Sequence, residues 1–218
     1  MTGIKANRVK IALWAALALV VASAGGCGMS KPYPEKSLYA ISVSQPAEKD
    51  PAPSKHIVRI NSVRMSRPYE GAAFVYKTGE SKFTTDYYSG FITPPGSMLT
   101  GELYSWMSNS GLFASVVSTS NAADYDMALA TEVTSLYGDY SQGKTGQATI
   151  EARFFLIDAS GGGARIVFQK TYREVEPLSA ETPDALVKGW NVAYQRMLTS
   201  LSADLRGSLA ASAASASR

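Results

Sequence analysis

The segment that most constrains this chain is an apolar stretch over residues 11–24, which is followed by small residues directly before Cys27. Basic residues precede the stretch, at Lys5, Arg8 and Lys10. A basic start, a short apolar middle and a small-residue exit are the three parts of a secretory signal peptide. The stretch holds about 14 residues, whereas a transmembrane helix needs roughly 20. We therefore expect residues 1–26 to be a signal peptide that is removed.

Cys27 is the single cysteine of the sequence, and it stands where a bacterial lipoprotein is acylated. The usual lipobox has Leu at the position that Ala24 occupies. An ordinary secretory signal cleaved near Gly26 is the alternative, but it would leave an unpaired thiol in an oxidising compartment. Lipidation removes that difficulty, and two or more acyl chains such as palmitate hold a protein stably on a bilayer. Gly28 stands in place of the Asp of an inner-membrane retention signal, so we expect the periplasmic face of the outer membrane.

The charge balance argues against nucleic acid as a partner. The whole chain has a net charge of +3, from 21 basic and 18 acidic residues. The predicted signal peptide carries three of the basic residues and none of the acidic ones, so the 192 residues from Cys27 onward are neutral. A neutral chain offers no electrostatic footprint for a phosphate backbone. Its length suffices for one domain with a substantial core.

The sequence offers few groups for catalysis or metal binding. His56 is the sole histidine, and its alternating apolar surroundings predict an exposed position at the end of a strand. A nucleophile that depends on a histidine base would need His56, and a zinc site could draw on little except carboxylates. No spacing of acidic residues singles out a catalytic pair. We therefore expect no enzymatic activity, no metal and no cofactor.

Period-two alternation of apolar residues predicts eight strands, over residues 38–44, 56–65, 74–77, 81–88, 113–118, 125–137, 147–159 and 165–175. A change of parity in the second of these predicts a bulge near Asn61 and Ser62. Thr78-Gly79 predicts that 74–77 and 81–88 form a hairpin. The last three strands are expected to pair as an antiparallel meander. In 147–159, one face is predicted to be buried by Ile150, Ala152, Phe154 and Leu156.

Apolar residues at steps of three and four predict two helices. The first starts at Thr93-Pro94-Pro95, a cap residue followed by prolines, and stops at Gly111; its stripe comprises Leu99, Leu103 and Trp106. The second starts at Thr182-Pro183, and its stripe comprises Leu186, Trp190, Tyr194, Met197, Leu201 and Leu205. After Gly207 almost all residues are Ala or Ser, which predicts a frayed or disordered tail.

These elements predict an α+β fold, a single domain in which a mostly antiparallel sheet has two main helices packed on one face. The expected parts are the signal peptide (1–26), the lipidated cysteine with its tether (27–37), the domain (38–206) and the Ala/Ser-rich tail (207–218).

A set of residues between positions 74 and 113 is similar to the motif of a known family. The set comprises Phe74-Val75-Tyr76-Lys77, Asp86-Tyr87-Tyr88, Phe91, Pro94-Pro95, Leu99, Trp106 and Ser110-Gly111-Leu112-Phe113. Together with the lipobox, it resembles the ABC-type transport auxiliary lipoproteins, the PqiC-like partners of mammalian-cell-entry (MCE) systems, from about Tyr39 to Leu205. The family usually has Arg where Lys77 stands, and Lys cannot replace Arg in a bidentate contact.

The resemblance implies a non-enzymatic role in moving lipids between two membranes. The chain would be an outer-membrane lipoprotein that serves an MCE-domain protein, with a permease and an ATPase in the inner membrane. The ATPase would supply the energy, and this subunit would dock the periplasmic conduit at the outer membrane. A homo-oligomer is compatible with this role, and the sequence does not name the lipid.

The motif has two interpretations. In the first it is structural, because aromatic side chains dominate core burial, and its residues are Tyr76, Lys77, Asp86, Tyr87, Pro95, Trp106 and Phe113. Its aromatic members would then pack the hairpin on the first helix. In the second, the loop before that helix presents an apolar patch to a partner or to an acyl chain, through Tyr88, Phe91 and Ile92.

Two other functions are open at this point. A lipoprotein cofactor of cell-wall synthesis would also place a small α+β domain on an outer-membrane anchor, but it would need a long tether to cross the peptidoglycan. About 11 residues separate Cys27 from the first predicted strand, an extended reach of at most roughly 40 Å, which argues against a partner deep in the wall. A carboxylate-dependent hydrolase would lose its activity when one acid is substituted, and the sequence nominates none.

Overall fold

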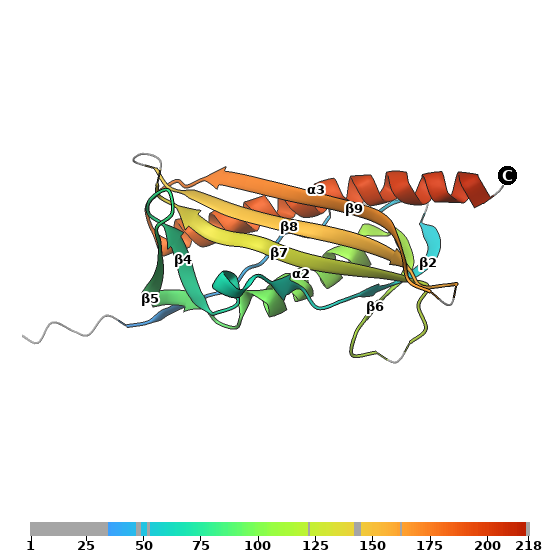
Figure 1. The fold of residues 1–218 in the computed structure, drawn as a ribbon, viewed down its shortest axis with the longest axis horizontal. Helices are drawn as coiled ribbons and strands as arrows, with labels where there is room; N and C mark the ends of the chain where they lie inside the picture. The colour runs from blue at the N-terminus through green and yellow to red at the C-terminus, as the bar shows by residue number, and fades with distance from the viewer. Residues whose placement is uncertain are drawn as a thin grey trace, which may run out of the picture. The chain divides into compact units, whose positions relative to one another are not determined.

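Nine strands and two long helices make up the described part of the chain (Figure 1). The computed structural model describes residues 35–46, 49–51, 53–121, 123–141, 145–161 and 163–216. Residues 36–218 form one compact unit. Its elements are β1 (Ser37–Tyr39), β2 (Ser54–Ile60), β3 (Arg64–Met65), the 3-10 helix η1 (Arg67–Tyr69), β4 (Ala73–Lys77), β5 (Phe83–Phe91), α2 (Pro95–Ser110), β6 (Phe113–Ser118), β7 (Met127–Asp139), β8 (Gln147–Asp158), β9 (Arg165–Pro177) and α3 (Pro183–Ala216).

Strand β7 lies at the centre of the sheet. Along one of its edges β8 runs antiparallel, and β9 runs antiparallel to β8. The other edge receives three short parallel strands in succession: β2 beside residues 127–129, β3 beside 132–133 and β4 beside 138–139. Strand β6 pairs with the outer edge of β2, while β5 and then β1 extend the sheet beyond β4.

The sheet is mixed, so the expectation of a mostly antiparallel sheet is wrong, whereas the α+β class is confirmed. Among the described strands five pairings are parallel and three are antiparallel. The antiparallel pairings are the predicted hairpin and meander, which join neighbours in the sequence. The parallel ones join distant segments, such as Ile60 with Leu129, and no short turn marks them in the sequence.

One face of the sheet shares a core with the helices. As predicted, the alternating apolar residues of β8 are fully buried, namely Ile150, Ala152, Phe154 and Leu156. The six residues of the predicted α3 stripe are buried too. Figure 1 shows α3 running behind β8 and β9, and Lys170 and Tyr172 of β9 both donate hydrogen bonds to Asp204 of α3. The predicted stripe and the predicted buried face therefore pack on each other.

Helix α3 extends further than its sequence indicates. It passes through Gly207 and continues to Ala216, so the expectation of a frayed tail from residue 207 is wrong for this stretch. Ala has the highest intrinsic helix propensity, and one interior Gly costs only about 1 kcal/mol. Leu209 lies beyond Gly207 and is buried in the core, which attaches the extension to the rest of the unit.

The first predicted strand pairs with the sheet over only three residues, as β1. Ile41 and Val43 are nonetheless buried. The backbone amide of Ser42 donates to Asn191 Oδ1 of α3 at 3.1 Å, and that of Val43 donates to Glu102 Oε2 of α2 at 3.2 Å. The extended segment after β1 therefore uses side chains of the two helices as hydrogen-bond partners in place of a neighbouring strand.

The second predicted strand is divided into β2 and β3. Four residue steps lead from Ile60 to Arg64, whereas three lead from Leu129 to Glu132 on the partner strand. This segment therefore contains one residue more than β7 does, which is the insertion that the change of parity predicts.

The predicted helix starts and stops are mostly correct. Thr182 caps α3, because its Oγ1 accepts a hydrogen bond from the amide of Ala185 at 3.2 Å. At α2 the expected cap by Thr93 is not formed; Pro94 occupies the cap position without a side-chain hydrogen bond. Gly111 ends α2 with a φ of 69°, in the left-handed region that favours glycine.

Candidate functional site

A tyrosine and an aspartate join the two strands of the motif hairpin. The Tyr76 hydroxyl on β4 donates a hydrogen bond to Asp86 Oδ2 on β5 at 2.7 Å. Asp86 Oδ1 accepts hydrogen bonds from the backbone amides of Tyr88, at 2.8 Å, and Ser89, at 3.0 Å. One carboxylate oxygen therefore fixes β5 to β4, and the other shapes the chain immediately after Asp86.

The shaped segment is a large bulge in β5. Ala73 pairs with Gly90 and Val75 pairs with Thr85, so five residue steps along β5 oppose two along β4. The surplus falls on residues 86–89, which we call the tyrosine bulge. A bulge changes the direction of side chains relative to the regular alternation of a strand. The Asp86 carboxylate stabilises the tyrosine bulge by accepting hydrogen bonds from two of its backbone amides.

The tyrosine bulge presents two aromatic rings to solvent. Tyr87 is 73% exposed and Tyr88 is 42% exposed. Their rings make a T-shaped contact, with centroids 5.0 Å apart. The packing role expected for Tyr87 is therefore wrong. The physical reason is the bulge itself, because β4 has too few residues to lie opposite this part of β5.

Hydrogen bonding fixes the ionisation of the Tyr76–Asp86 pair. Burial alone would raise the pKa of Asp86, but the hydrogen bonds from Tyr76, Tyr88 and Ser89 together outweigh it and hold this pKa below its ordinary value. Burial and the neighbouring carboxylate raise the pKa of Tyr76. At neutral pH the phenol therefore stays the donor and the carboxylate stays the acceptor.

Phe91, expected in the loop before the first helix, lies at the end of β5 and belongs to the core. It is 3% exposed, and its ring packs on Phe74 and Trp190 with centroid distances of 4.7 and 5.3 Å. The patch role expected for Phe91 is therefore ruled out. Strand β5 runs three residues past its predicted end because β1 pairs with it there.

Exposed apolar side chains lie along this strand pair and directly after it. Leu38 of β1 lies beside Gly90 of β5 in parallel register. Along the chain Tyr88 precedes Gly90 by two residues, in the tyrosine bulge, and Ile92 follows it by two residues, directly after the end of β5. Leu38 is 55% exposed and Ile92 is 61% exposed. We call Leu38, Tyr87, Tyr88 and Ile92 the edge patch.

The remaining motif residues lie within or beside the core. Pro95, in the first turn of α2, is buried, and so are Trp106 and Phe113. Lys77 forms an ion pair with Asp139 of β7, with 3.8 Å between Nζ and Oδ2. The motif includes Lys77, but the sequence does not predict its partner Asp139, because the two residues are brought together only by the parallel pairing of β4 with β7.

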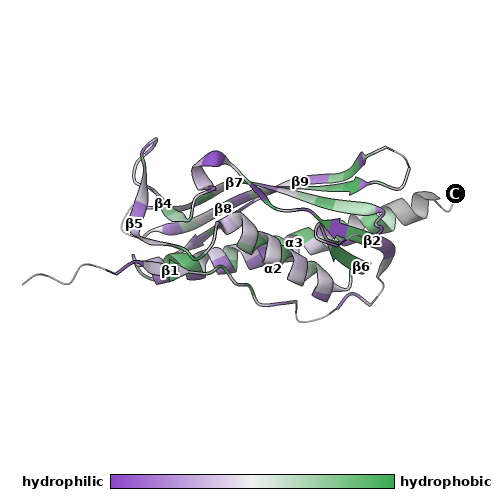
Figure 2. Ribbon diagram, turned by 90° about the horizontal axis from the view of Figure 1, so that it is seen from below, coloured by the Kyte–Doolittle hydropathy of each residue, from purple (hydrophilic) through white to green (hydrophobic). Residues whose placement is uncertain are grey.

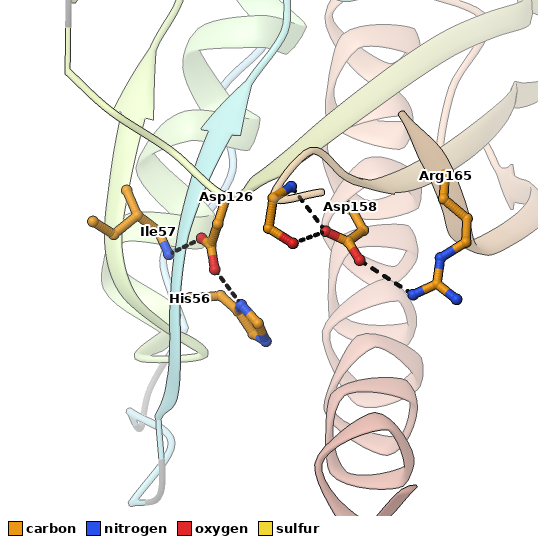
Figure 3. Close-up of polar contacts among 6 residues, drawn as sticks. His56, Ile57, Asp126, Asp158 and Arg165 are labelled. Carbon is orange, nitrogen blue, oxygen red and sulfur yellow. Dashed lines mark hydrogen bonds and ion pairs between the residues drawn. The ribbon is translucent and has the colours of Figure 1, made fainter. Parts of the chain in front are cut away.

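The sole histidine lies at the other end of β7, where Figure 3 shows its contacts. His56 Nδ1 is 2.5 Å from Asp126 Oδ2, and Asp126 Oδ1 accepts the backbone amide of Ile57 at 2.7 Å. An aspartate can orient a histidine base, but here both carboxylate oxygens tie β2 to the segment that leads into β7. This pair could not be predicted from the sequence, since the two residues are 70 positions apart and no local pattern joins them.

A second polar group in Figure 3 closes the turn between β8 and β9. Hydrogen bonds from the hydroxyl and amide of Ser160 and from Arg165 lower the pKa of Asp158 to about 2. In the described part of the chain, no three His, Cys, Asp or Glu residues are grouped so that they could hold a metal ion.

Cys27, Gly28 and the signal peptide over residues 1–26 lie outside the described residues, so acylation stays a prediction. None of the helices described in the structure is long and apolar enough to span a membrane.

Comparison with protein families gives a match over residues 39–205, to the ABC-type transport auxiliary lipoprotein component. The chain belongs to this family. The match runs from the last residue of β1 into α3, and it confirms the resemblance that the hairpin motif carries. Members of the family are lipoproteins that assist a transport system, a class that is not typically enzymatic. A comparison with curated proteins finds no match.

Solved structures share the fold of this auxiliary lipoprotein. A crystal structure of a Xanthomonas campestris protein assigned to family DUF330 is 20% identical, with a TM-score of 0.69; the alignment covers 84% of this chain and all of that one. A crystal structure of an uncharacterized protein is 15% identical, with a TM-score of 0.62, and the alignment covers 78% of this chain and 99% of that one. At these identities the likeness concerns the fold alone.

Proposed function

We propose that this auxiliary lipoprotein is the outer-membrane subunit of an MCE-type ABC system that moves phospholipids between the two membranes. The family match over residues 39–205 is the observation that carries the proposal. The position of Cys27 after a signal peptide supports the anchor, and the neutral charge of the chain beyond the signal agrees with a protein partner rather than a nucleic acid.

In this proposal the subunit positions the conduit at the membrane and does not catalyse a reaction. An ATPase and a permease in the inner membrane supply the energy and the first transfer step, and an MCE-domain protein forms the conduit across the periplasm. Acyl chains on Cys27 hold this subunit on the periplasmic face of the outer membrane. Its folded domain then docks the end of the conduit at that membrane.

The proposal is tested by isolating the acylated full-length protein from membranes in mild detergent. We expect an MCE-domain protein to co-purify, with the permease and ATPase at lower yield, and genes for these proteins to lie beside the gene for this chain. A matched control is the Cys27→Ala variant, which keeps the domain but cannot be acylated. Consistent absence of an MCE-domain protein, both from the complex and from the neighbouring genes, would contradict the proposal.

The anchor has a test of its own. Mass spectrometry of the mature N-terminus should find acyl groups on Cys27, and separation of the two membranes by density should place the protein in the outer-membrane fraction. An unmodified thiol at Cys27 would remove the anchor, whereas acylated protein in the inner-membrane fraction would overturn only the location.

A further inference from the structure

We propose that the edge patch docks on the phospholipid surface that holds Cys27 and inserts its side chains among the lipid headgroups. The inference rests on the acylation of Cys27 that belongs to the proposed function, and adds to it an orientation of the domain on the bilayer.

A short tether keeps the edge patch close to the membrane. Ten residue steps lead from Cys27 to Ser37, the first residue of β1, so the start of β1 lies within about 35 Å of the acylated cysteine. Leu38 follows directly, and β1 pairs with residues 89–91 of β5, the segment that Tyr88 precedes and Ile92 follows. Among the residues that the structure describes, the edge patch is therefore the exposed apolar surface nearest in the chain to the membrane anchor.

The chemistry of the patch suits a membrane surface. It combines two aliphatic side chains with two tyrosines, and a tyrosine has an apolar ring with a polar tip that suits the boundary between lipid and water. The neighbouring Asp86 keeps its negative charge, but its oxygens accept hydrogen bonds from Tyr76, Tyr88 and Ser89 within the hairpin, so it is not the group that contacts the headgroups. Lys36 and the adjacent Glu35 are both exposed, so the segment just before Leu38 has no net charge that would repel anionic headgroups.

The backbone that carries the patch is preorganised. Asp86 holds the tyrosine bulge through the amides of Tyr88 and Ser89, and the amide of Ile92 donates to the carbonyl of Tyr39 at 2.8 Å. The side chains of the patch are thus presented by a backbone that is already ordered, which lowers the entropic cost of docking.

The described surface offers a matched control at the other end of the sheet. Figure 2 shows β1, β4 and β5 at one end of the unit and β2 and β6 at the other. Ile166 of β9 is 54% exposed and pairs with Ile157, which in turn pairs with Ala128 near the start of β7. β4 meets β7 at residues 138–139, so about ten residues of strand, roughly 33 Å, separate Ile166 from the hairpin end.

The experiment places one fluorophore on the acylated full-length protein. Cys27 is the only native cysteine, so once it carries lipid the substitution Ile92→Cys introduces the one free thiol. Ile166→Cys is the matched control, because both isoleucines are exposed. Each variant is labelled with an environment-sensitive dye and reconstituted into vesicles of phosphatidylethanolamine and phosphatidylglycerol, with and without brominated acyl chains. Circular dichroism checks that both variants are folded.

We expect the dye at position 92 to shift its emission to shorter wavelength in vesicles and to lose most of its intensity with brominated lipid, while the dye at position 166 does neither. The added substitution Tyr88→Ser should reduce the quenching at position 92. If, in vesicle-bound protein, the dye at position 92 is as exposed to water as the dye at position 166, the inference is overturned. The patch would then be a candidate contact for a protein partner. If the protein does not float with vesicles at all, the anchor itself fails, and the inference fails with it.

Discussion

The indole nitrogen of Trp106 on α2 donates a hydrogen bond to the hydroxyl of Ser202 on α3, at 2.9 Å, inside the core. A second bond joins the same helices, from the Tyr194 hydroxyl to the backbone carbonyl of Leu99 at 3.0 Å. Tyr194 is buried, and burial raises its pKa, so its hydroxyl remains a donor. These two contacts fix the helix that follows the motif hairpin against the helix that covers the sheet.

Substitution Ser202→Ala should lower the free energy of unfolding by about 1–3 kcal/mol, because it leaves the Trp106 indole nitrogen buried without a partner. Urea unfolding measures the difference. The control is Thr199→Ala on the same helix, whose exposed hydroxyl bonds only the Gln195 carbonyl at 2.9 Å. That change should stay within about 0.5 kcal/mol, and equal losses for the two variants would contradict the interpretation.

Substitution Gly90→Ala should destabilise the hairpin that carries the edge patch. A Cβ at Gly90 would lie 2.6 Å from the backbone oxygen of Ala72, and a backbone atom cannot rotate away. We expect a loss of about 2 kcal/mol or more in the free energy of unfolding, as for other overpacked sites. Gly101→Ala on α2 is the control, since its Cβ would meet nothing within 4 Å; it should stabilise the protein by about 0.5–1 kcal/mol. If Gly90→Ala left the free energy of unfolding unchanged, the backbone at Ala72 would be able to move away from position 90.

The elements that the sequence predicts well are those whose packing follows a local period. The alternation of β8 and the stripe of α3 each bury one face of one element. The pattern that predicts this burial lies within a few neighbouring residues of the sequence. The order of β2, β3 and β4 along one edge of β7 depends instead on contacts between distant segments. Parallel pairing needs no short turn, so its strands carry no local sign of their partners.

The sequence motif contains the residues of the hairpin, but it does not predict how the hairpin is folded. The packing interpretation of the motif placed Tyr87 in the core, and the patch interpretation placed Phe91 in an exposed loop. The tyrosine bulge instead exposes Tyr87, and Phe91 is buried at the end of β5, where β1 pairs with it. A signal was available, because an aspartate whose side chain can accept the amide two residues later is a turn former. Asp86 followed by Tyr88 is such a case.

Substitution Gly207→Ala tests the extension of α3 into the Ala/Ser-rich segment. Gly207 lies inside the helix, and a Cβ there would meet nothing within 4 Å. Alanine should therefore stabilise the protein by about 0.5–1 kcal/mol and raise its helical circular dichroism. Gly71→Ala, in an open position outside the helices, should leave the helical signal unchanged. If the helix ended before residue 207, the two variants would give the same signal.

The pH dependence of stability should reveal the Tyr76–Asp86 pair. Because the pKa of Asp86 lies below its ordinary value of about 3.9, the unfolded chain binds more protons than the native one in this range. The stabilisation from Asp86 is thus fully present above the ordinary pKa and is lost as the pH falls through the lowered one. Several other acids titrate too, so the quantity to measure is the difference between the wild type and Asp86→Asn.

That difference in the free energy of unfolding should be largest near pH 7 and should shrink steadily below about pH 4, when urea unfolding is repeated across this range. Tyr76→Phe removes one of the hydrogen bonds that lower the pKa of Asp86, so it should cost about 1 kcal/mol near pH 7 and move this pKa upward. A difference between wild type and Asp86→Asn that did not change with pH would mean that the carboxylate does not hold the tyrosine bulge through its charge.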